Sequence, residues 1–198
     1  ADSHTALQQM FGYLLTPDTA QQKLFVLVGP TRSGKGTIGR VLEKLLGRSN
    51  VCAPSMSSLA EPFGLQCMIG RQLALVSDMR LSARTDQAAV AETLLKVSGE
   101  DNVNVARKNR DDWEGRLSVR FVIMSNEAPT LNDPSGALLG RYIVMQMRQS
   151  FLGREDRGLD AVLRSELSGI LNWAIAGWRD LKACGHLLQP TSAEMMIR

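Results

Sequence analysis

The sequence predicts an α/β fold in which helices flank a parallel sheet. Three short apolar runs, residues 23–28, 72–77 and 119–124, have the length and the β-branched or aromatic content of buried strands. Helical spacing of apolar residues between these runs predicts helices that connect them. Strands that alternate with helices are typical of a parallel sheet. The 198 residues suffice for one such domain with a sizeable core.

We expect an N-terminal helical lead-in over residues 1–22, a core over 23–150 and a C-terminal helical segment over 151–198 that packs on the core. The chain starts abruptly and ends without an obvious final cap, which we interpret as the mark of a fragment of a longer protein. No internal repeat or low-complexity stretch divides it.

Within the core, a helix is predicted over 35–46, with Gly47 as a stop signal, and another over 86–97, with Thr85 or Asp86 as its cap. Alternating residues 103–107 before the polar run 109–112 predict a hairpin inserted ahead of the third strand.

Further along the chain, a fourth strand is predicted over 142–147. Apolar residues at helical spacing then predict one long helix over 159–178 that covers the sheet.

Composition argues against several classes of protein. No run of about 18 apolar residues could span a bilayer and no secretory signal is present, so we expect a cytoplasmic protein without a membrane partner. Cys52, Cys67 and Cys184 are far apart in sequence and odd in number, and neither they nor the two histidines have metal-site spacing, so reduced thiols are predicted. The net charge of +3 permits contact with nucleic acid without establishing it.

A phosphate-binding loop is the strongest chemical signal. The motif G-x-x-x-x-G-K lies between a predicted strand and a predicted helix, the context that it requires, and consists of Gly29, Pro30, Thr31, Arg32, Ser33, Gly34 and Lys35. Small residues let backbone N–H groups surround phosphates, the helix N-terminus favours an anion, and Lys35 supplies a cation. The sequence therefore predicts that ATP binds here.

The predicted Mg²⁺ site departs from the usual motif. The position after the lysine is Gly36, which has no hydroxyl, so Thr37 becomes the candidate metal ligand. Asp78 ends the second predicted strand, where such folds place a second acidic ligand. The neighbour Met79 is not acidic, so no carboxylate is assigned to act on the attacking water.

Together with the phosphate loop and Asp78, the segments Ser98-Gly99-Glu100-Asp101, Arg107-Lys108 and 121–127 resemble the superfamily III helicase part of phage and plasmid primase-helicases. The resemblance covers about residues 12 to 190. It implies an AAA+ type core that assembles as a ring, usually of six subunits, around single-stranded DNA, with ATP between subunits. It also implies that Asn126 is the polar sensor that positions the attacking water or contacts the γ-phosphate.

The same resemblance implies two further roles. Arg141 would be an arginine finger that reaches the nucleotide of the next subunit, a role that suits a planar and permanently charged group. Lys108 would lie on a hairpin in the central channel, flanked by Arg107 and Arg110, and would contact DNA phosphates. Only Trp113 is a nearby aromatic residue, and five acidic residues balance the five basic ones between 100 and 120.

Two alternatives remain open from the sequence. The first is a nucleotide or small-molecule kinase, because some nucleotide kinases share the sequence Gly-Lys-Gly-Thr. Such kinases usually carry an arginine-rich lid, whereas this chain is predicted to insert a hairpin. A regulatory module that binds ATP with little turnover is also compatible with the missing second acid after Asp78. No polymerase-type acid pair or zinc-ribbon cysteine set is present, so primer synthesis is not expected of this chain.

Overall fold

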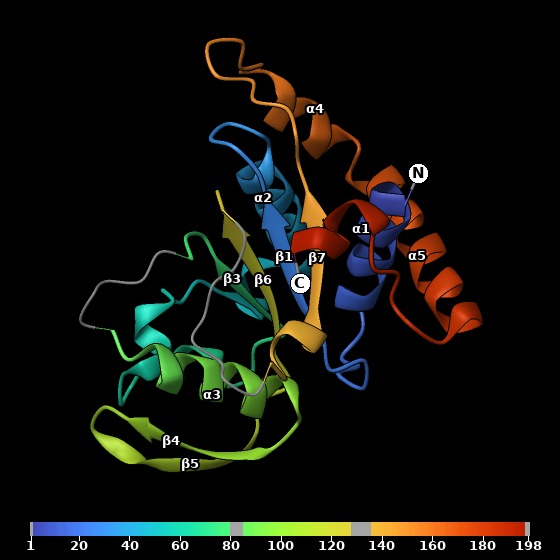
Figure 1. Cartoon of the computed structure of the whole chain (residues 1–198). Helices are drawn as coiled ribbons and strands as arrows, with labels where there is room; N and C mark the ends of the chain where they lie inside the picture. The colour runs from blue at the N-terminus through green and yellow to red at the C-terminus, as the bar shows by residue number, and fades with distance from the viewer. Residues whose placement is uncertain (1, 80–84, 128–135, 197–198) are drawn as a thin grey trace.

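The structure, a computed structural model, describes residues 2–79, 85–127 and 136–196 (Figure 1). Within these ranges, five parallel strands form a central sheet in the order β2-β3-β6-β1-β7, and β4 and β5 form a separate antiparallel hairpin. Helices flank the sheet, so the predicted fold class is confirmed.

The central strands are β1 (Leu24–Val28), β2 (Val51–Cys52), β3 (Leu73–Val76), β6 (Arg120–Ser125) and β7 (Tyr142–Gln146), and the hairpin strands are β4 (Asn102–Arg107) and β5 (Arg110–Arg116). The α-helices are α1 (Asp2–Leu14), α2 (Lys35–Leu46), α3 (Gln87–Ser98), α4 (Leu159–Ser165) and α5 (Leu167–Cys184). Short 3-10 helices are η1 (Arg48–Asn50), η2 (Ser57–Ala60), η3 (Gln66–Met68), η4 (Leu139–Arg141) and η5 (Thr191–Met196).

Strand β1 divides the core into two layers. All five of its residues are buried, and successive side chains point to opposite faces of the sheet. Val26 packs in the cluster that includes residues of α3, whereas Phe25 and Leu27 pack with residues of α1, α2 and α5. Figure 1 shows the hairpin and α3 together on the side of the sheet away from α1 and α5. The carboxyl ends of β1, β3 and β6 meet at one edge, because these strands are parallel neighbours.

Helix α5 packs chiefly against α1, which lies between it and the sheet. A Cβ atom on Gly12 would lie 2.3 Å from the backbone nitrogen of Trp178, and one on Gly177 would lie 2.2 Å from the carbonyl oxygen of Gln8. Real Cβ atoms do not come this close to backbone, so the absence of a side chain at both positions allows the two helices to touch.

The prediction of one long helix over 159–178 is wrong. Helix α4 ends at Ser165 and α5 begins at Leu167, with Glu166 at φ −96° and ψ 7° between them. Val162 is 50% exposed, so part of the predicted apolar face does not cover the sheet. The helical spacing of apolar residues continues across Glu166, because the break inserts no extra residues into the sequence. The sequence pattern therefore does not reveal the bend.

The predicted hairpin is also present, and its turn lies at Lys108 and Asn109, with Asn109 at φ 58°. Asparagine tolerates this left-handed conformation better than most residues, which explains the turn position. Cys52, Cys67 and Cys184 are free thiols, as predicted, and the neighbouring Cys52 thiol lowers the pKa of Cys67 to about 7.

The other predicted boundaries are largely confirmed. Helix α2 has the predicted limits, and the Asp86 side chain caps α3 by accepting a hydrogen bond from the backbone nitrogen of Ala89 at 3.0 Å. The short edge strand β2 was not predicted, because two residues carry no periodic signal. Within the described ranges, no helix has both the length and the apolar character needed to cross a membrane.

Candidate nucleotide-binding site

The phosphate loop joins β1 to the first turn of α2, as predicted. Its start is fixed to the sheet, because the backbone nitrogen of Gly29 donates to the carbonyl of Ser125 at 3.1 Å. A Cβ on Gly29 would lie 2.4 Å from the carbonyl oxygen of Met147 on the neighbouring segment, so only glycine fits. Gly34 caps α2 at φ 97°, a conformation that glycine adopts at little cost. The loop therefore presents the N-terminus of α2 to an anion.

The ammonium group of Lys35 lies over this loop. Its Nζ donates to the carbonyl oxygens of Gly29 at 2.6 Å and Pro30 at 2.9 Å, and it lies 3.3 Å from Oγ of Ser33. It also donates to Oδ1 of Asn126 at 3.1 Å. Partial burial lowers the pKa of Lys35 below its usual value by desolvation. Each of these acceptors is an oxygen that a phosphate oxygen could replace.

A hollow of about 390 Å³ opens beside Lys35. It is lined by residues from the phosphate loop and from the ends of two neighbouring strands: Thr31, Arg32, Ser33, Gly34, Lys35, Gly36, Thr37, Arg40, Ser77, Asp78, Met124 and Asn126. The predicted site residues Lys35, Thr37, Asp78 and Asn126 are thus brought together, because parallel strands deliver their carboxyl ends to one edge. Gly29 and Pro30 support the loop without lining the hollow.

The oxygen ligands needed for Mg²⁺ lie in this hollow. Thr37 offers a hydroxyl and Asp78 a carboxylate, and Mg²⁺ usually takes one or two protein oxygens together with substrate phosphates and waters. The described residues contain no group of three or more His, Cys, Asp or Glu side chains suited to a metal. The donor set therefore fits a metal held jointly with phosphate oxygens.

Arg40 is a site residue that sequence reasoning missed. Its guanidinium donates to Oγ1 of Thr37 at 3.1 Å and lies 3.5 Å from Asp160 of α4. Arg40 follows Thr37 by three residues on α2, and residues at this spacing share a helix face. That spacing was the only signal available in the sequence.

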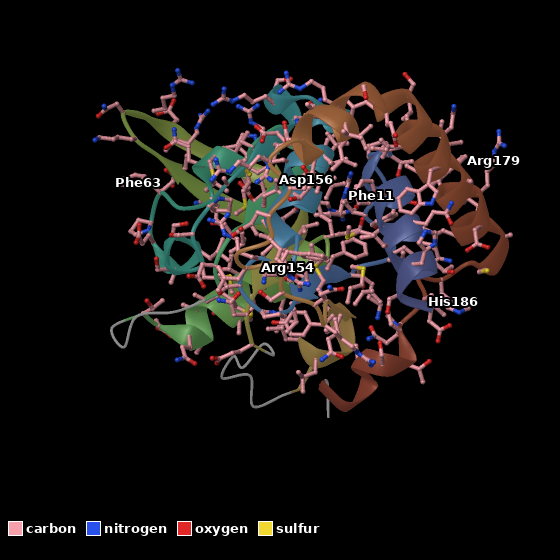
Figure 2. The ribbon with its side chains drawn as sticks, turned by 90° about the horizontal axis from the view of Figure 1, so that it is seen from above. Phe11, Phe63, Arg154, Asp156, Arg179 and His186 are labelled. Carbon is pink, nitrogen blue, oxygen red and sulfur yellow. The ribbon has the colours of Figure 1, made fainter. Side chains whose placement is uncertain are left out.

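A segment after β7 also lies against the phosphate loop and was not predicted there. Oγ of Ser150 donates to the carbonyl of Thr31 at 2.8 Å, and the backbone nitrogen of Phe151 donates to the carbonyl of Arg32 at 3.0 Å. Arg32 also pairs with Glu155 at 3.5 Å. Figure 2 shows Arg154 and Asp156 of this segment near the middle of the molecule when it is viewed from above.

Arg141 lies outside the hollow, at the C-terminal end of α3. Its guanidinium donates to the carbonyl of Leu95 at 2.7 Å and to Oγ of Ser98 at 2.8 Å. Burial and the positive charge of Arg141 lower the pKa of Lys23. Arg141 therefore caps α3 of its own chain. A finger would act on a neighbouring subunit, so that role stays a prediction. Residues 133–135, shortly before Arg141 in the chain, lie outside the described residues.

The predicted DNA-binding residues cluster at the hairpin tip. Lys108 and Arg110 are exposed, while Arg107 is half-buried and donates to the carbonyl of Asp111 at 2.7 Å. The backbone nitrogen of Lys108 donates to Oε1 of Gln66 at 3.2 Å, which ties the tip to η3.

Trp113 is half-buried against the core, so it is not presented at the hairpin tip for stacking on a base. A Cβ on Gly115 would lie 3.0 Å from its ring. The tip therefore has exposed cations at Lys108 and Arg110 but does not present the ring of Trp113.

Solved structures confirm the architecture. The C-terminal region of NrS-1 superimposes with a TM-score of 0.73 at 14% identity, covering 96% of this chain and 46% of that one. JCV helicase superimposes with a TM-score of 0.55 at 14% identity, covering 98% of this chain and 57% of that one. This chain spans less than two thirds of either structure, and at such low identity the likeness concerns the fold.

Sequence comparison places the chain in a family. The uncharacterized mitochondrial protein ymf21 of Marchantia polymorpha is 31% identical over 58 residues, which are 29% of this chain and 32% of that protein. The sequence profile of a family of unknown function, DUF5906, matches residues 27–141, more than half of the chain. The chain therefore belongs to the DUF5906 family.

Proposed function

We propose that this chain is the ATP-dependent motor of a DNA helicase or translocase of the phage or plasmid primase-helicase type. The observation that carries the proposal is the meeting of Lys35 and Asn126 at the rim of one hollow. A P-loop lysine and a polar residue at the end of the adjacent strand are the pair that a γ-phosphate and its attacking water require. The shared fold of JCV helicase, named a helicase, supports the same assignment.

Each site residue has a role in hydrolysis. Backbone N–H groups of residues 31–37 would hold the phosphates, and Lys35 would exchange its carbonyl contacts for phosphate oxygens. Thr37 and Asp78 would hold Mg²⁺, which neutralises charge on the phosphates when bound. Asn126 would orient the attacking water.

The proposed movement along DNA uses more than one subunit. We place the nucleotide between subunits of a homo-oligomeric ring, expected to be a hexamer, with Arg141 supplied to the neighbouring site. Exposed Lys108 and Arg110, supported by Arg107, would contact the phosphates of single-stranded DNA in the channel. Hydrolysis would then be coupled to hairpin movement through α3, whose end Arg141 contacts.

Hydrolysis of ATP by the native chain and by Lys35→Ala tests the chemical part of this proposal. We expect Lys35→Ala to reduce turnover by about a hundredfold or more, the cost typical of removing one preorganised electrostatic contact. Lys182→Ala is the matched control, because that lysine lies on α5 near Trp178 and outside the hollow. A change of oligomer size with ATP that is not consumed would favour the regulatory module instead.

One observation favours a kinase as the second candidate. The segment against the phosphate loop contains Arg148, Arg154 and Arg157, so an arginine-rich stretch lies beside the site in addition to the inserted hairpin. A kinase would consume ATP only when an acceptor is present. ATP consumption that requires a nucleoside monophosphate and ignores DNA would therefore select the kinase.

A further inference from the structure

A second hollow of about 550 Å³ adjoins the phosphate hollow. The two share four lining residues, Arg32, Gly34, Thr37 and Arg40, so they form one continuous depression with two parts. Its volume falls within the range of about 300–1,000 Å³ that is typical of small-molecule sites. A ligand anchored on the phosphate loop could therefore extend directly into the second part.

The walls of the two hollows differ in chemistry. The second hollow is lined in part by Phe151 and Leu159, which are 42% and 40% exposed. These are large apolar side chains in a stretch otherwise rich in charge, and their exposed surface gains free energy when a flat apolar ligand covers it. The phosphate hollow, in contrast, has Lys35 and backbone amides.

The apolar wall is held at a fixed place relative to the phosphate loop. Phe151 donates its backbone nitrogen to the carbonyl of Arg32, and the adjacent Ser150 bonds to Thr31. The ion pair between Arg32 and Glu155 joins the same two segments again. A ligand that spans both hollows would thus meet a wall already positioned for it, which reduces the ordering cost of binding.

We propose that the second hollow takes the nucleoside part of the nucleotide, with the base stacked on the ring of Phe151. This inference rests on the proposed function, because it requires phosphates at Lys35, and it adds the residue that recognises the base. Asp156 lines the same hollow and supplies a carboxylate that can accept hydrogen bonds from ribose hydroxyls. Inorganic triphosphate should therefore use only the first hollow, whereas ATP should use both.

The test compares the affinities of ATP and inorganic tripolyphosphate, each with Mg²⁺, by calorimetry. Phe151→Ala should weaken ATP about tenfold, the loss typical of one base–aromatic stack, and leave tripolyphosphate unchanged. Phe151→Trp should retain ATP affinity. Leu152→Ala is the matched control: the neighbouring side chain is 66% exposed but does not line the hollow, so both affinities should persist.

The outcomes separate the inference from the function on which it rests. ATP binding that depends on Lys35 but is equal in Phe151→Ala and Leu152→Ala would overturn the nucleoside site alone. Equal weakening of both ligands by Phe151→Ala would also overturn it, because Phe151 would then act through the phosphate loop. A native chain that binds neither ligand would overturn the proposed function as well.

Discussion

Nζ of Lys35 lies 3.1 Å from Oδ1 of Asn126, although the two residues are separated by 91 positions in the chain. The contact joins the phosphate loop after β1 to the end of β6, the strand that pairs with β1 in parallel. The parallel pairing of β1 and β6 is enough to place both side chains at the same edge of the sheet. The contact thus connects the group that binds phosphate to the group proposed to orient water.

Asn126→Ala should separate binding from hydrolysis. Without the amide oxygen and nitrogen the attacking water has no orienting partner at this position, so turnover should fall by about a hundredfold while ATP affinity changes little. Rapid-mixing hydrolysis and equilibrium binding measure the two effects. Asn102→Ala, at the exposed start of β4, is the control. Weaker ATP affinity with native turnover at saturating ATP would show that Asn126 serves binding alone.

Thr37→Ala should reduce Mg²⁺-dependent hydrolysis about tenfold or more, because the hydroxyl next to the usual ligand position is removed. Gly36→Ser should restore part of this activity in the Thr37→Ala background by recreating the ordinary motif. A side chain fits at Gly36, where an added Cβ would have Arg40 at 3.5 Å as its nearest neighbour. Full Mg²⁺-dependent turnover in Thr37→Ala alone would remove the threonine from the metal site.

Arg141→Ala should lower the free energy of unfolding by about 1–3 kcal/mol, since the variant has no charged donor at the end of α3. Ser98→Ala removes one of the two hydrogen bonds and keeps the charge, so it should cost less and leave turnover native. Urea unfolding followed by circular dichroism measures both. An Arg141→Ala chain with native stability would show that the helix cap contributes nothing.

Lys108→Ala and Arg110→Ala should each weaken binding to single-stranded DNA without sequence preference. Removal of one cation that binds a phosphate should make the slope of log affinity against log salt shallower by about 0.7. Arg116→Ala is the control, because it is exposed at the opposite end of the same hairpin. Fluorescence anisotropy over a range of salt gives the slopes. Equal slopes in all variants would exclude the hairpin tip from the interface.

Tyr13 should make the protein less stable at alkaline pH. It is 1% exposed, and burial raises its pKa to about 12. The contribution of Tyr13 to the free energy of unfolding is complete below the pKa of about 10 in the unfolded chain. It is lost as the pH rises to about 12, and the free energy of unfolding falls by up to about 1.4 kcal/mol per pH unit. Tyr13→Phe should lack this part of the pH dependence in urea unfolding between pH 9 and pH 11. Identical profiles for the two proteins would contradict the effect of burial.

The sequence predicted the fold well where patterns are local. Residues 23–28 read as a strand because the run is apolar and β-branched after Lys23, and helix 35–46 has both a periodic face and a glycine stop. Prediction from local patterns failed at Glu166. One residue interrupts the helix there, although the helical spacing of apolar residues continues on both sides.

The candidate site was predictable to the extent that it depends on motif and topology. Lys35, Thr37, Asp78 and Asn126 line one hollow because their strands are parallel neighbours. The wall at Phe151 could not be predicted, since its position depends on a backbone hydrogen bond to Arg32 that has no sequence signature. Contacts of this kind are fixed by tertiary packing alone.

Mixing two inactive variants tests whether the nucleotide site is shared between subunits. ATP hydrolysis would be measured with single-stranded DNA, over a range of protein concentrations, for Lys35→Ala, Arg141→Ala and their equimolar mixture. We expect each variant to be inactive and the mixture to regain activity, because one subunit supplies Lys35 and its neighbour supplies Arg141. Turnover of the native chain that is independent of concentration and DNA, with no recovery on mixing, would exclude a shared site and the proposed ring motor.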